Sequence, residues 1–581
     1  MSPQHRSSPN GRAQRAFRRL LSPRVIITKV NAIIRRLFRK TERAPMYSDP
    51  EERDVLTGKT EHVHTPHHEE AREERVQGTC LMMPDTVRRT LTISSVTGEA
   101  GGLALIEALP SEVLLEIFDC HRLLAVRSSG PSWVPWEWHR LAHVCSRWRS
   151  IIFESRHRLN LRLVYTYKQP VRKTLDFWPT LPVAIRYPRS TRFRSVTSKD
   201  EDNIIAALKH PDRICELNVP MTKSLLSKSA SLLQASFPML ECLRLGSQDA
   251  TRPLILPIGF LGGSTPRLRD IHLTSTAFSA LPLLIRSARA LVSLQLDDIP
   301  NSGYFSPEAL AAGLSATTQL KLLKVYFHPP SFRPEQRRTP SPPKSRSILP
   351  ALTEIHFKGN SDYLEDLVAR IDAPAVEQLD INFLELNTFD TPQVAQFINR
   401  TKTLRSPHRT SIRLSDDDIT ITHEFRLSPP SSASRSIRLQ IACDDVDRQM
   451  SILVHVGRQF SMLLSSVEAV NADGSPTLFS LRDQRETDTA KWLEILRHFR
   501  GVRKFEVTGA LVPNIASTLE QVTGNMARGI LPFLRDLHLD GSESSTSPSI
   551  EPFVAARQLS SHPVSVHYTR DDSSDNLSDN D

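Results

Sequence analysis

The chain has 581 residues, which is long enough for several domains or for one extended repeat array. Its content of 39% hydrophobic and 24% charged residues is typical of a soluble protein that carries disordered segments. The formal net charge of +10 comes from one end, because residues 1–44 hold twelve Lys or Arg against one acidic residue, Glu42, and the rest is close to neutral. Composition therefore argues against a broad phosphate-binding surface, and no nucleic-acid partner is expected.

The apolar runs are too short to cross a membrane. One of the longest, 281–285, has five residues, whereas a transmembrane helix needs about twenty. The first residues also lack the uninterrupted apolar core of a secretory signal. Six Cys are scattered along the chain without a C-x-x-C pair, which argues for reduced thiols and against a zinc ribbon or a disulfide framework. We therefore expect an intracellular protein of the cytoplasm, the nucleus or both.

Residues 1–44 form a basic tail in which apolar and basic side chains are interleaved. From 24 onward the pattern allows a basic amphipathic helix, with Pro23 at or before its first turn. Three interpretations stay open: mitochondrial targeting, contact with an acidic membrane or partner, and a solvated extension. Nucleic-acid binding through this tail is a further hypothesis, which predicts an affinity that falls steeply with salt.

Residues 45–103 are polar and low in aromatic residues, which predicts a disordered linker. The linker contains a cluster of residue types that can bind metals: His62, His64, His67, His68, Glu69 and Glu70. A flexible segment gives such ligands no fixed geometry, so no metal site is expected there.

Two short amphipathic segments follow, at 109–118 and 138–152. The first opens with Leu109 and Pro110. Proline suits the first helical position because it lacks the backbone N–H group that would stay unpaired there. Four apolar residues then recur at i, i+1, i+4 and i+5, which predicts a helix with one apolar stripe: Val113, Leu114, Ile117 and Phe118. The second segment predicts another helix through Leu141, Val144, Cys145, Trp148 and Ile152. Two helices of this size must bury their apolar faces against something else.

The pattern Leu-Pro-x-Glu-Val-Leu-x-x-Ile-Phe, followed by Leu-x-x-Val-Cys-x-x-Trp-Arg-x-Ile-Ile, resembles an F-box, and more specifically the F-box-like proteins abundant in mushroom-forming fungi. The resemblance implies a small helical domain at 104–158 that binds a Skp-type adaptor of a cullin–RING ubiquitin ligase. The adaptor-binding residues that it implies are Leu109, Pro110, Val113, Leu114, Ile117, Phe118, Leu141, Val144 and Trp148. One departure is the long connection 127–138, which reads as a loop from its Gly and Pro residues and yet carries three Trp. Two ordinary core helices of a larger domain are the alternative.

Downstream, a repeat of the form apolar-x-x-apolar-x-apolar recurs. It occurs as Ile214/Leu217/Val219, Leu240/Leu243/Leu245, Leu268/Ile271/Leu273, Leu291/Leu294/Leu296, Leu320/Leu323/Val325, Leu352/Ile355/Phe357, Val376/Leu379/Ile381, Val502/Phe505/Val507 and Leu534/Leu537/Leu539. The first seven triplets start 23 to 32 residues apart, with helix-like stretches between them. One strand and one helix per such period is the unit of a leucine-rich-repeat solenoid. The Asn or Cys expected after each strand is absent, so an α/β domain with several crossovers is the alternative.

The expected fold class is therefore α/β: a small helical F-box, then an irregular leucine-rich-repeat-like solenoid of parallel strands backed by helices, with disordered termini. The solenoid is placed at 159–400, and terminal repeat-like units at 489–541. Between them, 401–488 is rich in strands but has no clear repeat register. Residues 542–581 are Ser-rich and acidic, and should be disordered.

A Pro-rich stretch, 328–347, interrupts the repeat and should project as a loop. Within it, Thr339 and Ser341 each precede a proline, as in proline-directed phosphorylation sites.

Motifs of catalysis are missing from the sequence, including a Gly-rich phosphate loop, H-E-x-x-H and G-x-S-x-G. His139 and His143 stand four residues apart, which is metal-ligand spacing, but no third ligand is visible. Cys145 occupies a position where the F-box pattern carries an apolar residue or Cys, so a packed thiol is expected rather than a nucleophile. We expect no enzyme activity, no cofactor and no metal.

The leading functional hypothesis is a substrate-recognition adaptor of a cullin–RING ubiquitin ligase. The F-box would bind a Skp-type adaptor within the cullin complex, and the repeat region would bind an unknown protein substrate. The second hypothesis keeps the fold without the ligase: the two helices would cap the open end of the solenoid, and the chain would be a non-catalytic repeat scaffold for protein–protein interaction.

Overall fold

The computed structural model describes residues 109–128, 137–166, 171, 174–175, 181–187, 196–247, 252–329, 345–384, 390–426, 434–475, 485–524, 526–540 and 550–569. These residues form two compact units that divide between Leu161 and Arg162. The first is a helical unit and the second is a sheet unit. The basic tail, the linker with its His cluster, the middle of the long connection and most of the Pro-rich stretch with Thr339 and Ser341 lie outside the described residues.

The sheet unit is built on one sheet of sixteen strands. In spatial order these are β1 (Leu163–Tyr165), β2 (Val183–Arg186), β3 (Ile214–Met221), β4 (Cys242–Ser247), β6 (Asp270–Thr274), β8 (Ser293–Ile299), β9 (Leu322–Phe327), β11 (Glu354–Gly359), β13 (Gln378–Phe383), β16 (Ser436–Ala442), β15 (Asp418–Glu424), β14 (Arg409–Leu414), β17 (Ala469–Gly474), β18 (Lys504–Gly509), β19 (Asp536–Asp540) and β20 (Ser565–Thr569). All neighbours pair in parallel except β15, which is antiparallel to both β14 and β16. Two further parallel pairs are β5 (Leu254–Ile255) with β7 (Thr276–Ala277) and β10 (Ser347–Ile348) with β12 (Ile371–Asp372).

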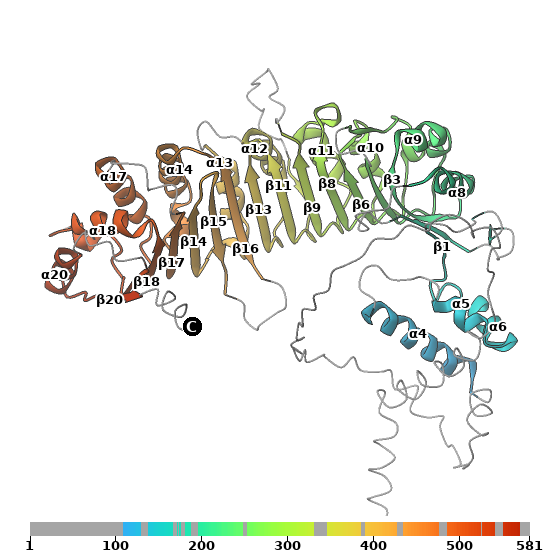
Figure 1. Cartoon of the computed structure of the whole chain (residues 1–581), viewed down its shortest axis with the longest axis horizontal. Helices are drawn as coiled ribbons and strands as arrows, with labels where there is room; N and C mark the ends of the chain where they lie inside the picture. Colours follow the sequence, from blue (N-terminus) through green and yellow to red (C-terminus); the bar gives the residue numbers. More distant parts are fainter. Residues whose placement is uncertain are drawn as a thin grey trace, which may run out of the picture. The chain divides into compact units, whose positions relative to one another are not determined.

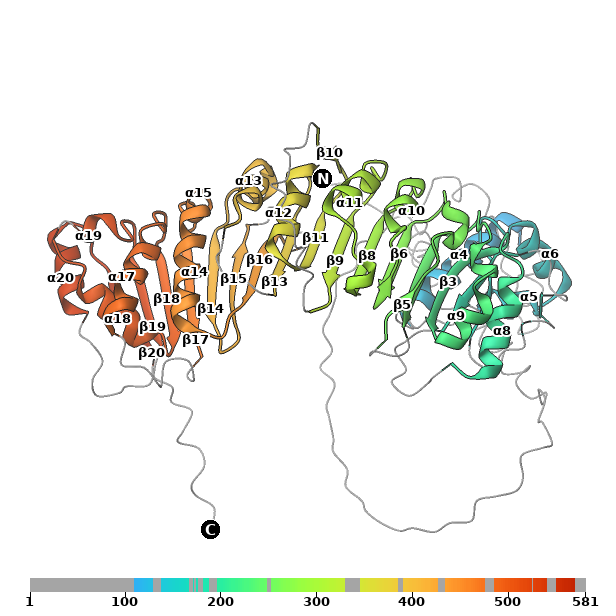
Figure 2. The same cartoon turned by 90° about the horizontal axis from the view of Figure 1, so that it is seen from above.

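Helices connect successive strands of the sheet unit. They are α8 (Ser198–Leu208), α9 (Lys223–Ser229), η3 (Leu232–Gln234), η4 (Phe260–Gly263), α10 (Leu281–Ser287), η5 (Asn301–Gly303), α11 (Pro307–Leu314), α12 (Ser361–Arg370), α13 (Pro392–Arg400), η6 (Lys402–Leu404), α14 (Val446–Gln459), α15 (Ser461–Leu464), α17 (Arg485–Leu496), α18 (Val512–Glu520), α19 (Met526–Gly529) and α20 (Glu551–Leu559). Helices α10 to α13 lie along the outer side of the arc that the strands follow (Figure 1, Figure 2). Among the described residues, no helix covers the inner face of the strands between β6 and β13.

The core lies between the strands and these helices. Each predicted triplet contributes its last two apolar residues to a strand, as Leu243 and Leu245 do on β4. Parallel pairing aligns these residues in two rows, Leu243, Ile271, Leu294, Leu323, Ile355 and Leu379 in one and Leu245, Leu273, Leu296, Val325, Phe357 and Ile381 in the other. None of the twelve is more than 3% exposed. The strands predicted from the triplets are confirmed, because alternate residues of a strand share one face.

An antiparallel meander interrupts the parallel order within 401–488. After β13 and α13 the chain passes over two strand positions to β14, turns into β15 and returns through β16, which pairs with β13. Helix α14 then leads to β17, which pairs in parallel with β14. Only residues 415–417 connect β14 to β15, and a connection that short permits only antiparallel neighbours. This reversal is why the region has no repeat register in the sequence.

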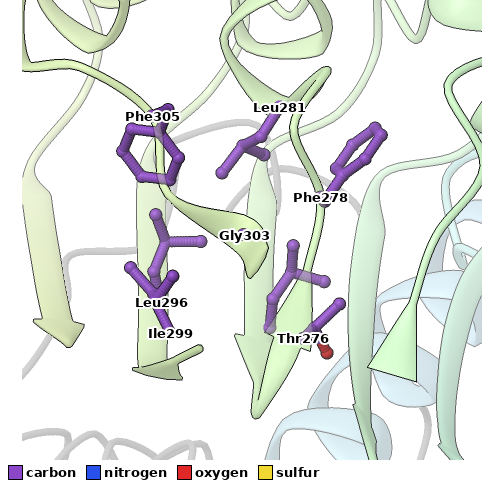
Figure 3. A pocket seen from close by; sticks show the side chains of 8 residues that line it. Thr276, Phe278, Leu281, Leu296, Ile299, Gly303 and Phe305 are labelled. Atoms are coloured by element: carbon purple, nitrogen blue, oxygen red, sulfur yellow. The ribbon is translucent and has the colours of Figure 1, made fainter. Parts of the chain in front are cut away.

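A small cavity lies between β6, β8 and the segments that follow them (Figure 3). Its volume is about 10 Å³, which is at the lower limit for a single water molecule. Thr276 supplies the only polar side chain of its lining, which otherwise consists of Leu273, Phe278, Leu281, Leu296, Ile299, Gly303 and Phe305. A cavity of this size and polarity has no room for a small-molecule ligand.

Gly303, which lines this cavity, is packed too closely for any side chain. A Cβ atom built on Gly303 would lie 2.7 Å from the Cα atom of Ala277, a backbone atom that cannot rotate away. We expect Gly303→Ala to lower the free energy of unfolding by about 1–3 kcal/mol, as overpacking of a core does. Gly529→Ala is the matched control, because nothing lies within 4 Å of its Cβ position. Chemical denaturation followed by circular dichroism compares the two, and equal stabilities would contradict the close packing.

His423 on β15 is buried in the core beside Thr410 of the neighbouring strand β14. The Thr410 hydroxyl lies 2.8 Å from Nδ1 of His423. Burial lowers the pKa of His423 from its ordinary value of 6.5 to about 4, so the folded protein keeps this imidazole neutral at mildly acidic pH.

We expect the stability of the sheet unit to decrease as the pH falls from about 6.5 to about 4, because the unfolded chain binds a proton at His423 and the folded chain does not. The contribution is up to ~3 kcal/mol and is constant below the folded pKa. His423→Asn removes the titration and keeps a polar partner for Thr410, so its free energy of unfolding should depend less on pH in this range. Denaturation curves at pH 7 and pH 4.5 measure the difference, and identical pH dependence in both proteins would refute the assignment.

The chain after 541 differs from the disordered tail expected at 542–581. Helix α20 and strand β20 fold onto the end of the sheet, where β20 pairs with β19. Phe553 of α20 is fully buried, and Nη2 of Arg557 donates to the carbonyl oxygens of Pro532 and Leu534 at 3.1 Å each. The sequence prediction missed this final unit, because the Ser-rich residues beside it outweighed the short apolar pattern of α20 and β20.

Candidate functional site

The described part of the helical unit contains α4 (Ser111–Ser128), α5 (Glu137–Ala142) and α6 (Ser146–Glu154). The sequence predicted two helices, but the second segment is broken between Ala142 and Ser146. Cys145 lies at the break and caps α6, because its Sγ accepts the Trp148 N–H at 3.4 Å. His139 and His143 therefore do not share one helix, and the metal-ligand spacing that they have in the sequence is not kept on a helical face.

The start of α4 also differs by one position from the prediction. The Pro110 carbonyl accepts the N–H groups of Val113 and Leu114 at 3.1 Å each, so Pro110 precedes the first helical residue instead of being it. The residues 127–128 and 137–138 of the long connection belong to α4 and α5, and Trp138 packs edge-on against Phe153 of α6 at a ring distance of 5.9 Å.

Four of the nine predicted site residues form the core of the helical unit. Leu114, Phe118, Leu141 and Trp148 are all at most 4% exposed. The rings of Phe118 and Trp148 meet edge-on with centroids 4.8 Å apart, which joins α4 to α6. Because these side chains are already buried, they support the fold of the unit, and their direct contact with a partner stays a prediction.

The other five predicted residues are accessible. Leu109, Val113 and Ile117 follow one another at i, i+4 and i+8, and each is partly exposed. Within α4 this spacing places Val113 and Ile117 on one side of the helix, where side chains four residues apart are neighbours, and Leu109 lies just before its first turn. Pro110 is exposed beside them, and Val144 is partly exposed in the turn between α5 and α6. The accessible apolar stripe at the start of α4, formed by Leu109 and Pro110 just before the helix and by Val113 and Ile117 on it, is the candidate binding surface.

Two arginines that the sequence did not single out hold this stripe in place. Nη2 of Arg147, on α6, donates to the Leu109 carbonyl at 2.6 Å and so fixes the residue that opens the stripe. Arg158 forms ion pairs with Glu116 and Asp119 on α4, the second at 3.3 Å. Exposed ion pairs of this kind contribute little each, so their role is to orient α4 rather than to stabilise it strongly. The only feature of the sequence that could have indicated a role for these two arginines was their position close to Trp148.

Two cysteine thiols, those of Cys120 and Cys145, lie in the described part of the helical unit. Burial, together with the carboxylates of Glu116 and Asp119, raises the pKa of the Cys120 thiol. A raised pKa keeps the thiol protonated, whereas a nucleophilic cysteine needs the thiolate. Cys145 is occupied in capping α6, in agreement with the packed thiol expected from its position.

Between β6 and β13 the inner face of the sheet unit is a second surface, over which no helix of the described residues lies. Strand pairing aligns one polar residue from each strand of the sheet except β1 in a continuous row: Arg186, Asn218, Arg244, His272, Gln295, Lys324, His356, Asp380, Arg438, Thr422, Ser411, Asn471, Glu506, His538 and His567. These positions alternate with the buried apolar rows, so the same period that predicted the core also predicts this row.

Charges along this row are paired with acids on neighbouring strands. Oδ2 and Oδ1 of Asp297 lie 2.8 Å from Nε2 of His272 and 2.7 Å from Nζ of Lys324. Although burial opposes it, hydrogen bonds from these two side chains hold the pKa of Asp297 below its usual range. Arg244 and Asp270 form a similar pair at 3.2 Å. In these pairs basic side chains of the row are matched by acidic side chains on adjacent strands.

Other kinds of site find no support within the described part of the chain. No group of three or more His, Cys, Asp or Glu residues there could hold a metal ion. No helix among the same residues is long and apolar enough to cross a membrane.

The described part of the helical unit buries its own core and leaves the apolar stripe accessible, and accessible apolar surface can mark an interaction site. Residues 106–162 match the family model described as F-box-like, which covers α4, α5, α6 and the accessible stripe. The chain therefore carries an F-box-like domain, and the boundaries of the match lie within four residues of the predicted 104–158. No curated protein matches the sequence.

Proposed function

We propose that this chain is a substrate-recognition adaptor of a cullin–RING ubiquitin ligase. Its F-box-like domain would bind a Skp-type adaptor, which an F-box domain implies, and its sheet unit would bind a protein substrate. The observation that carries the proposal is the accessible stripe of Leu109, Pro110, Val113 and Ile117, because it lies within the residues that match the F-box-like family and is not needed for their core.

The size of the stripe suits a stable contact with a helical groove. Burial of a large apolar side chain contributes roughly 1.5–3 kcal/mol relative to exposure, and the stripe offers four partly exposed or exposed side chains. A few such anchors commonly carry most of the affinity of a protein interface. Their rigid presentation on α4, which Arg147 and Arg158 orient, limits the entropy lost on binding.

For the sheet unit we propose a degenerate leucine-rich-repeat-like solenoid, with the antiparallel meander as an insertion. The parallel register of the strands and the two apolar rows support this interpretation. The polar row on the inner face would be the substrate-binding surface. Its charged side chains could form ion pairs with a protein whose surface carries complementary charges.

We assign no catalytic step to this chain. It would hold a substrate lysine near a ubiquitin-loaded enzyme elsewhere in the complex, which raises the local concentration of the reacting groups. The free thiols of Cys120, Cys145, Cys215, Cys242 and Cys443 support an intracellular location. We also propose that this chain is related to the F-box-like proteins of mushroom-forming fungi.

Co-purification tests the proposal against a scaffold without ligase association. The full chain, tagged and expressed in cells, should bring down a Skp-type adaptor and a cullin together, which mass spectrometry identifies. A scaffold would bring down other proteins but neither of these two, and that result would contradict the proposal.

A further inference from the structure

The sheet ends at β20 without a covering unit. Among the described residues, β20 pairs only with β19, so its other edge presents unpaired backbone groups. Ser565 donates its N–H to the Arg535 carbonyl at 2.7 Å, which fixes the direction of alternate residues. Ser565, His567 and Thr569 therefore bond to β19, and the backbone N–H and C=O groups of Val566 and Tyr568 point to the free edge.

Val566 and Tyr568 also occupy core positions, and within the described part of the chain Val566 is only partly covered and Tyr568 is exposed. Val566 pairs in register with Leu537, and Tyr568 pairs with Leu539, both of which are buried. Tyr568 is nevertheless 69% exposed, whereas Leu539 is 3% exposed. Elsewhere in the sheet the next unit buries these two rows, and the described residues contain no further unit after β20. Leu559 at the end of α20 is also exposed, at 88%.

The next residues of the chain are not suited to cover this edge. Residues 570–581 contain five Asp and one apolar residue, Leu577. Such a segment can neither fill two apolar positions nor lose its charge hydration without cost. The occupant must bring a strand edge and apolar side chains of its own.

We propose that the occupant is the β20 edge of a second copy of this chain, so that two sheets continue into each other around a two-fold axis. The edge is self-complementary when the axis passes through His567. Val566 then stands opposite Tyr568 of the partner subunit, and each such pair exchanges two backbone hydrogen bonds. The same arrangement sets Tyr568 against the partner subunit's Val566 on the helix-bearing side, where both would be buried. His567, whose ring stacks on His538 at 4.6 Å, would lie opposite its own copy.

A contact of one five-residue strand with few apolar side chains is smaller than a standard interface, so a weak dimer with a dissociation constant in the micromolar range, about 1–100 μM, is expected. The full chain alone, examined by sedimentation equilibrium, should show a mass that rises with concentration toward twice 65.5 kDa. Val566→Pro removes the backbone N–H group that points to the free edge of β20. Tyr568→Asp places a negative charge at the exposed core position that the second copy would cover. Each should raise the dissociation constant at least tenfold, with circular dichroism unchanged.

A cysteine pair checks the register and does not depend on those variants. His567→Cys should form a disulfide-linked dimer under mild oxidation, because residues opposite each other at the axis come within disulfide distance. Ser565→Cys is the matched control, since its copy would lie several residues away, and it should stay monomeric in non-reducing electrophoresis like the unmodified chain. A monomer at 100 μM, equal cross-linking at both positions, or a dimer that survives Val566→Pro and Tyr568→Asp would each overturn the proposal.

Discussion

Aspartate at both Val113 and Ile117 is expected to weaken binding of the full chain to a Skp-type adaptor at least 100-fold. Both side chains are partly exposed on α4, so the substitutions leave the core of the helical unit in place. In the complex, each carboxylate would be buried in an apolar groove without a partner, which costs several kcal/mol. A 100-fold loss corresponds to about 2.7 kcal/mol, which two such groups readily exceed.

Titration of the adaptor by isothermal calorimetry measures this loss. His157→Asp is the control for added charge, because it places one aspartate at an exposed position of the same unit. A milder variant, Leu109→Ala with Pro110→Ala, removes apolar contacts without adding charge and should also abolish capture in a pull-down. Full affinity in the double aspartate variant would mean that the accessible stripe is not the binding surface.

Trp148→Ala is expected to unfold the helical unit while the sheet unit stays folded. Trp148 is 4% exposed and its ring contacts Phe118 across α4 and α6. Removal of a buried aromatic ring usually costs about 3–5 kcal/mol, and a small core such as the one described between α4, α5 and α6 has little stability to lose. Hydrogen exchange read by mass spectrometry should show rapid exchange in α4, α5 and α6 and unchanged protection in the strands.

The control for this experiment is His157→Ala, an exposed position of the same unit that should keep the protection of the unmodified chain. Loss of adaptor binding should accompany the unfolding in Trp148→Ala, whereas the double aspartate variant should lose binding with its helices still protected. If the two variants lose binding with the same exchange pattern, the division into core and accessible residues is wrong.

Local apolar patterns predicted the strands well, because alternation within a strand and burial are directly linked. Leu243 and Leu245, for example, stand two residues apart, and both face the helices. The same apolar patterns did not predict the antiparallel pairing of β14, β15 and β16, where the chain reverses direction. The turn between β14 and β15, Ser415-Asp416-Asp417, carries residues that favour turns, and this signal could have shown the antiparallel pair.

Periodicity also could not divide the binding residues from the core residues of the helical unit. On α4, Val113 and Leu114 are adjacent, as are Ile117 and Phe118, so both stripes follow the same helical period. Which stripe is buried depends on where α6 packs, and that depends on the contact of Trp148 with Phe118. The break before α6 was missed as well, because Leu141, Val144 and Trp148 keep helical spacing across the turn.

Direct binding of the purified full chain to a purified Skp-type adaptor tests the central claim most simply. Light scattering behind size-exclusion chromatography would give the stoichiometry, and calorimetry would give the affinity. We expect one adaptor per chain with a dissociation constant below about 1 μM, as a few well-buried apolar anchors can provide. Separate elution of the two proteins at tens of micromolar, with no heat of binding, would contradict the account.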